Sequence, residues 1–208
     1  PVVSSAASDV YKRQIYEHIT YGGFKFFTIA QIPELKNRVV TMNGVSKSYA
    51  MTGWRIGYAA GPKEIIKAIS KIQSQSTTNP SSISQAAAVE ALNGNQDFIS
   101  IRAKAFEERR DFVVNTLNSI NGIKCLKPDG AFYVFPNCKN LIGKKDINGK
   151  KIENDTDFVQ SLLENNGVAV VQGSAFGLEG YFRISYATSM DNLKRALKKI
   201  SDFCESLK

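Results

Sequence analysis

The chain has 208 residues, of which 43% are hydrophobic and 22% charged, so it is long enough to bury a core in one or two domains. Lysine and arginine exceed aspartate and glutamate by 27 − 19 = 8, but the basic residues are scattered and lack interleaved aromatic residues, which argues against a nucleic-acid partner. No apolar run approaches the roughly 18 residues needed to cross a bilayer. The single histidine, His18, excludes a multi-histidine metal site.

The first fourteen residues differ in pattern from the rest of the chain. Residues 2–9 show neither strand alternation nor a helical stripe. We therefore expect 1–14 to be a foreign stretch, with the native sequence resuming near Ile15.

Beyond Ile15 the pattern becomes regular. Pro62 suits the start of a helix, Asn79-Pro80 breaks that helix, and Ser81 or Ser82 is expected to cap the next one. Apolar runs predict strands in this part of the chain at 24–29, 39–42 and 56–60.

The second half begins with a long predicted helix at about 97–119. Strands are predicted at 123–126, 131–135, 168–171 and 181–186. Thr156 is expected to cap a helix that ends at Asn166-Gly167, and an amphipathic helix is predicted at 191–207. The order of elements indicates an α/β chain with two parts, a domain remnant at 15–94 and a compact α+β unit at 95–208.

The three cysteines, Cys125, Cys138 and Cys204, form an odd set with no metal or redox spacing. Free thiols are typical of a reducing compartment, so a cytoplasmic location is expected.

The most informative segment is 43–61. It places Lys47 in a loop of small and hydroxyl residues, directly after an apolar run, with Arg55 eight positions later between Gly53 and Gly57. A lysine amine at the mouth of a buried strand can attack carbonyls, and an arginine fork matches phosphate oxygens. The pair suggests a covalently held aldehyde cofactor that carries a phosphate.

Residues 46–58, Ser-Lys-Ser-Tyr-Ala-Met-Thr-Gly-Trp-Arg-Ile-Gly-Tyr, resemble the cofactor-lysine motif of the class I/II aminotransferases, most closely the bacterial aspartate aminotransferase branch. Further motifs of that family occur in the same order at 15–18, 79–87, 128–136 and 180–187. The resemblance implies fold type I, with a remnant of the large-domain sheet at 15–94 and the small α+β domain at 95–208. It also implies pyridoxal 5′-phosphate as cofactor.

The resemblance assigns roles to residues near the cofactor. Lys47 would form the Schiff base and then carry a proton between the substrate Cα and the cofactor C4′. Arg55 would hold the phosphate, and Ser46 would either contribute a hydroxyl or cap its turn. Tyr16 would donate to the cofactor's phenolic oxygen. Gly44 replaces a serine that some relatives carry at this position, which removes one phosphate donor or leaves it to a backbone N–H.

Two further residues would serve the substrate. Arg183 would bind the α-carboxylate through both arms of its fork, on the face of its strand opposite Phe182 and Ile184. Asn79 is either close to the active site across a dimer interface or a helix cap. Trp54 and Tyr133 are expected to pack in the core.

One position departs from the family. An aspartate there pairs with the cofactor's pyridine nitrogen three residues before the tyrosine, whereas this chain has Arg13, followed by Gln14. Arg13 is either a genuine replacement or part of the foreign stretch. Because the family's N-terminal half is also lacking, we expect the chain to be a C-terminal fragment that is inactive by itself.

Three functions remain in view. The first is amino-group transfer between an amino acid, with an aspartate-like substrate favoured, and a 2-oxo acid, in a homodimer that acts in amino acid metabolism and biosynthesis. The second is carbon–sulfur β-elimination on the same fold, because similarity of fold does not fix the reaction. The third is a non-catalytic effector-binding domain of an aminotransferase-like regulator.

Overall fold

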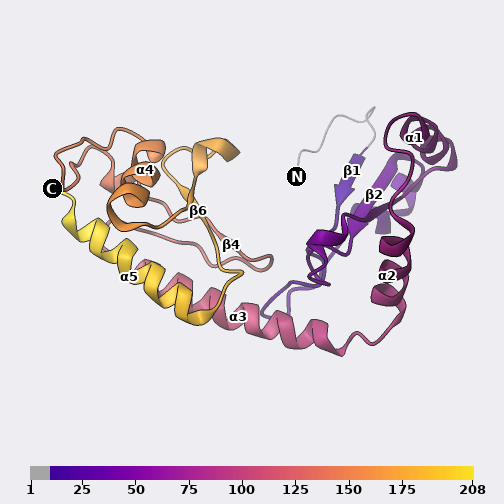
Figure 1. Cartoon of the computed structure of the whole chain (residues 1–208), viewed down its shortest axis with the longest axis horizontal. Coiled ribbons are helices and arrows are strands. Elements are labelled where there is room, and N and C mark those ends of the chain that lie inside the picture. The colour runs from indigo at the N-terminus through magenta and orange to yellow at the C-terminus, as the bar shows by residue number, and fades with distance from the viewer. Residues whose placement is uncertain (1–9) are drawn as a thin grey trace. The chain divides into compact units, whose positions relative to one another are not determined.

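The structure is a computed structural model that describes residues 10–208, with the backbone alone for 10–13. It forms two compact units, Pro1–Ala103 and Lys104–Lys208, and helix α3 (Asp97–Asn118) continues from the first into the second (Figure 1). Most of the predicted foreign stretch, 1–9, lies outside the described residues.

The first unit is built on a three-stranded sheet of order β1-β2-β3. Strand β1 (Val10–Arg13) runs parallel to β2 (Val39–Gly44), and β3 (Gly57–Ala60) pairs with β2 in the antiparallel sense. Val39 and Val40 are buried, as the apolar run predicts. Since β1 and β2 are parallel, the chain leaves both strands at the same edge of the sheet.

The predicted strand at 24–29 is wrong. Two short 3-10 helices, η1 (Ile29–Gln31) and η2 (Pro33–Arg38), come after a loop instead. Thr28 begins η1 with a capping box, because its hydroxyl accepts from Ala30 N while Gln31 accepts from Thr28 N. This local capping outweighs the apolar composition of the segment.

Helices α1 (Lys63–Ser76) and α2 (Ser82–Asn93) complete the first unit. Pro62 and Ser81 occupy their N-cap positions. The capping alternative for Asn79 is therefore wrong, and its side-chain amide instead donates to the neighbouring Pro80 carbonyl at 3.1 Å.

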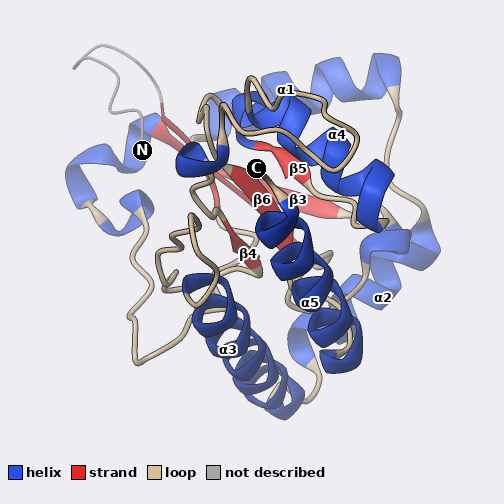
Figure 2. Ribbon diagram, turned by 90° about the vertical axis from the view of Figure 1, so that its left-hand side faces the viewer, coloured by secondary structure: helices blue, strands red, loops and turns tan. Residues whose placement is uncertain are grey.

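The second unit has a small antiparallel sheet of order β4-β6-β5, with β4 at Tyr133–Val134, β6 at Phe182–Ser185 and β5 at Val171–Gln172. Helices α4 (Asp155–Asn166) and α5 (Met190–Ser206) pack on it, and α5 runs beside the C-terminal part of α3 (Figures 1 and 2).

The strands of the second unit are shorter than predicted. The segment 123–126 contributes only an isolated bridge, between Lys124 and Asn137. The cap of α4 is Asn154, whose side chain accepts from Asp157 N, and Thr156 lies inside the helix. The predicted helix end is confirmed, since Gly167 adopts a left-handed φ of 66°.

Phe158 is the centre of the second unit's core. The centre of its ring lies 5.1 Å from the ring centre of Phe182 on β6 and 5.3 Å from that of Phe203 on α5. One aromatic cluster therefore joins helix α4, the sheet and helix α5. Across residues 10–208, no helix is long and apolar enough to cross a membrane.

Candidate active site

The candidate residues of the first unit gather at one edge of its sheet. Tyr16 lies in the turn directly after β1, and Lys47 lies in the turn directly after β2. Arg55 lies two residues before β3, which begins at this same edge because it pairs with β2 in the antiparallel sense. The carboxyl ends of parallel strands are the usual place for ligands in α/β proteins.

A hydrogen bond ties the two turns together. The Asn43 side-chain amide, at the end of β2, donates to the Glu17 carboxylate, which neighbours Tyr16. Partial burial, reinforced by the negative charge of Glu17, raises the pKa of Tyr49 and of Tyr58 nearby. Both phenols therefore stay protonated at neutral pH. Glu17 and Asn43 were not predicted as site residues, although they lie in the motifs at 15–18 and 43–61.

The loop at 45–56 is closed by two glycines that face each other. Gly44 pairs with Gly57 across β2 and β3, and a Cβ on Gly57 would come within 2.9 Å of the Asn43 carbonyl oxygen. Only glycine permits this approach, and it brings the ends of the loop together. Lys47 lies just after one end of this closed loop and Arg55 just before the other end, although they are eight positions apart in the sequence.

The loop also holds residues in an unfavourable backbone conformation. Ala50 and Arg55 have φ of 55° and 50°, the left-handed region, although neither is a glycine. Such residues cost of order 1–3 kcal/mol and cluster at functional sites. Arg55 closes the 3-10 turn Thr52–Trp54, and its Nη1 donates to the Thr52 carbonyl at 3.0 Å.

The residues present fit a phosphate-bearing aldehyde. Lys47 and Ser46 are half-buried in the turn that begins the loop, and the Lys47 carbonyl accepts from Ala50 N at 3.1 Å. The Arg55 side chain is exposed and uses one donor on Thr52, which leaves the rest of its fork for an anion. An amine and a guanidinium on one rigid loop match an aldehyde and a phosphate.

Asn79 is exposed, but its neighbour is close to this loop. Pro80 lines a cavity of about 310 Å³ together with Val45 and Ile56, which flank the lysine and arginine positions. Trp54 is 44% exposed, so the expectation that it packs in the core is wrong.

Arg183 belongs to the second unit. Its strand neighbours Phe182 and Ile184 are 0% and 8% exposed, whereas Arg183 is half-buried on the opposite face, as strand alternation predicts. Its guanidinium carbon lies 4.6 Å from the ring centre of Tyr133 and 4.3 Å from that of Phe176. Tyr133 therefore packs against the candidate site and is not a simple core residue.

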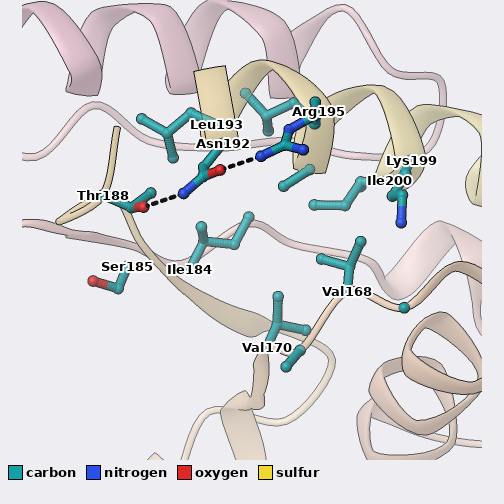
Figure 3. Close-up of a pocket in the computed structure, with 14 residues that line it drawn as sticks. Val168, Val170, Ile184, Ser185, Thr188, Asn192, Leu193, Arg195, Lys199 and Ile200 are labelled. Atoms are coloured by element: carbon teal, nitrogen blue, oxygen red, sulfur yellow. Dashed lines mark hydrogen bonds between the residues drawn. The ribbon is translucent and has the colours of Figure 1, made fainter. Parts of the chain in front are cut away.

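A cavity of about 410 Å³ lies on the other side of β6, between α5 and the segment after α4 (Figure 3). Its walls include Ile184, Val168 and Leu193, and Asn192 links Thr188 to Arg195 by hydrogen bonds at its rim. None of the predicted site residues lines this cavity, so it is separate from the candidate site.

At the position of the family aspartate, the backbone of Arg13 ends β1 and pairs with Met42. Gln14, the next residue, is 7% exposed; its backbone N–H donates to the Met42 carbonyl at 2.8 Å and its side chain donates to the Thr28 hydroxyl. Neither Arg13 nor Gln14 carries the negative charge that the family resemblance leads one to expect at this edge.

Comparison with known proteins identifies the family of the chain. Residues 14–200 match the family model "Aminotransferase class I and II". The chain is 60% identical over 194 residues to an aspartate aminotransferase of Rhizobium meliloti (strain 1021), covering 93% of this chain and 47% of the relative. It is 56% identical over 200 residues to a probable aspartate/prephenate aminotransferase of Rickettsia bellii (strain RML369-C), covering 96% and 50%.

Solved structures agree in fold. The crystal structure of the aspartate aminotransferase from Rhizobium meliloti matches with a TM-score of 0.94 and 58% identity, over 96% of this chain and 50% of that one. The Thermus thermophilus aspartate aminotransferase with maleate matches with a TM-score of 0.84 and 38% identity, over 94% and 48%. The predicted fold type I is confirmed, and the chain spans about half the length of the relatives it matches.

Proposed function

The chain belongs to the class I and II aminotransferases, and from this premise we propose that it serves amino-group transfer between an aspartate-like amino acid and a 2-oxo acid. Pyridoxal 5′-phosphate, which this family uses, would supply an electron sink when bound. The observation that carries the proposal is the convergence of Tyr16, Lys47 and Arg55 at one edge of the first sheet.

Each residue has a task that its position supports. The Lys47 amine binds the cofactor aldehyde and then moves a proton at the substrate Cα. Arg55 and Ser46 hold the phosphate, and Tyr16 donates to the cofactor's phenolic oxygen. Arg183 binds the substrate α-carboxylate through its fork of donors. Asn79, in the segment beside the cofactor loop, is the second substrate-binding residue.

The cofactor assignment can be tested on the chain as it is. The purified protein is mixed with pyridoxal 5′-phosphate, reduced with borohydride and digested, and mass spectrometry locates the modified lysine. Lys47 is expected to carry the label in the wild type, and Lys47→Ala to lose it. Lys63→Ala, which removes an exposed lysine at the start of α1, serves as the control and should label normally. Labelling spread evenly over the exposed lysines would refute the assignment.

Turnover is a separate measurement. The sequence predicts a partial site, so exchange of the amino group between aspartate and 2-oxoglutarate is expected to be absent with this chain alone. Measurable exchange by the purified chain would contradict the prediction that it is inactive by itself. With a cysteine thioether as substrate instead, release of a thiol, pyruvate and ammonia without exchange would favour the β-elimination alternative.

We also propose that the full-length protein is a homodimer in the cytoplasm. Support comes from the apolar side chains that α1 and α2 expose, among them Ile72 at 72% and Ile83 at 71%, since exposed apolar patches mark interaction surfaces. The three cysteines are free thiols, which suits a reducing compartment. Sedimentation of a full-length protein that contains this chain tests the dimer, and a monomer at all concentrations would contradict it.

A further inference from the structure

The guanidinium of Arg183 lies over two aromatic rings, at cation–π distance from each. Tyr133 on β4 places its ring centre 4.6 Å from the Arg183 guanidinium carbon, and Phe176 places its own at 4.3 Å. Both distances are within the range of cation–π contact. The two rings come from separate elements, β4 and the 3-10 turn η5 (Gly173–Phe176).

Neighbouring contacts fix Phe176. Its ring meets that of Phe135 edge-on, with centres 5.6 Å apart and an angle of 88°. The carboxylate of Asp155 is 2% exposed and accepts from Ser174 N, in the same turn as Phe176, at 2.6 Å. A buried charged acceptor holds a backbone N–H strongly, so the turn that carries Phe176 is anchored to the first turn of α4.

Contact with aromatic faces leaves the hydrogen-bonding edge of a guanidinium available. The five N–H donors of arginine lie in the plane of the group, whereas stacking uses only its two faces. The faces of aromatic rings carry partial negative charge and do not attract a carboxylate. An arginine that uses its faces for aromatic contact therefore offers the donors in its own plane to an anion.

We propose that Tyr133 and Phe176 are positioning residues that hold the Arg183 guanidinium in a fixed plane for in-plane, bidentate binding of a substrate carboxylate. The inference rests on the proposed function, because that function gives Arg183 its ligand. Neither ring contacts the carboxylate. Each acts by ordering the arginine before the ligand arrives, which lowers the entropy lost on binding.

The test follows the Nε–Hε signal of Arg183 by nuclear magnetic resonance in the full 208-residue chain, with succinate as the carboxylate probe. In the wild type this signal should show a ring-current shift and should move as succinate is added. Tyr133→Leu and Phe176→Leu should each lose part of the ring-current shift. Each should also bind succinate about 2- to 12-fold more weakly, the factor expected for ordering one long side chain.

Two comparisons separate the possible failures. Arg183→Lys should weaken the binding of succinate by about tenfold or more, because lysine lacks the planar fork of donors. Phe98→Leu is the matched control, since it removes a ring that lies 4.6 Å from the Arg102 guanidinium, and it should leave succinate binding unchanged. If Arg183→Lys weakens binding but the two leucine variants do not, the positioning role is wrong and the proposed function stands. If the wild-type Arg183 signal does not move when succinate is added, Arg183 does not bind the carboxylate, and both the proposed role and this inference are wrong.

Discussion

Two substitutions of Arg55 distinguish the effect of backbone strain on stability from the effect of the side chain on cofactor binding. Arg55 has a φ of 50°, and Ala50 in the same loop has a φ of 55°. Arg55→Ala and Arg55→Gly both remove the guanidinium and its 3.0 Å hydrogen bond to the Thr52 carbonyl. The two variants differ in the cost of the left-handed conformation, which alanine retains and glycine does not.

The expected difference is set by two opposing contributions. A non-glycine residue in the left-handed region costs about 1–2 kcal/mol, whereas glycine adds about 0.4–1 kcal/mol of conformational entropy to the unfolded chain. The free energy of unfolding of Arg55→Gly should therefore exceed that of Arg55→Ala by about 0.5–1 kcal/mol. Both variants should lose affinity for pyridoxal 5′-phosphate by about 10- to 100-fold, because a charge-assisted phosphate contact is gone.

Urea unfolding followed by tryptophan fluorescence measures the first quantity, since Trp54 is the only tryptophan and lies beside Arg55. Borohydride-trapped labelling of Lys47 measures the second. Ala50→Gly is the control. It should be more stable than the wild type by about the difference expected between Arg55→Gly and Arg55→Ala, and it should leave the labelling of Lys47 unchanged. Equal stability of Arg55→Gly and Arg55→Ala would refute the strain at this position, and unchanged labelling in both would refute the phosphate role.

Three further predictions concern the second unit. Tyr186→Phe removes the hydroxyl that donates to the Ala131 carbonyl at 3.0 Å, and urea unfolding should show a loss of about 1 kcal/mol because one part-buried hydrogen bond is lost. For Asp111, desolvation raises the pKa, but hydrogen bonds from Lys127 and Arg110 outweigh it and lower the pKa overall. The stabilising effect of the ionised Asp111 is therefore present above the unfolded-state pKa and is lost as the pH falls through the lower folded-state pKa. In urea unfolding at a series of pH values, Asp111→Asn should lose less stability below about pH 4 than the wild type does. Burial raises the pKa of the three cysteine thiols to about 11 or 12, so a thiol reagent at pH 8 should react slowly with the folded protein and rapidly in denaturant.

The cofactor loop could be predicted from the sequence because its chemistry is local. Lys47, Arg55 and the glycines around them lie within one short segment, and the structure shows a backbone reason for two of these glycines, Gly44 and Gly57. The helices were also predictable, since their apolar stripes and end signals are local, although the cap of α4 is Asn154 and not Thr156. The sheet edge that gathers Tyr16 with this loop required the parallel pairing of β1 and β2, which no local pattern specifies.

Other features were not accessible from local pattern. The segment 24–29 is apolar enough for a strand, yet its Phe24 and Phe27 are 50% and 60% exposed and a capping box at its end starts a 3-10 helix. The rings around Arg183 come from positions 50 and seven residues away along the chain, so no spacing indicated that they meet. Asp155 had no recognisable motif, although burial of its carboxylate marks it in the structure.

The groups assigned to the cofactor and the group assigned to the substrate lie in different units. Lys47, Arg55 and Tyr16 belong to the first, whereas Arg183 belongs to the second. Each set is held by contacts within its own unit, the Gly44–Gly57 pairing in one case and the aromatic rings in the other. A substitution that disturbs the contacts holding one set should therefore leave the contacts holding the other set intact. Lysine labelling and carboxylate binding consequently report on separate halves of the same proposed reaction, and a variant such as Phe176→Leu that changed both would show a coupling that these contacts do not provide.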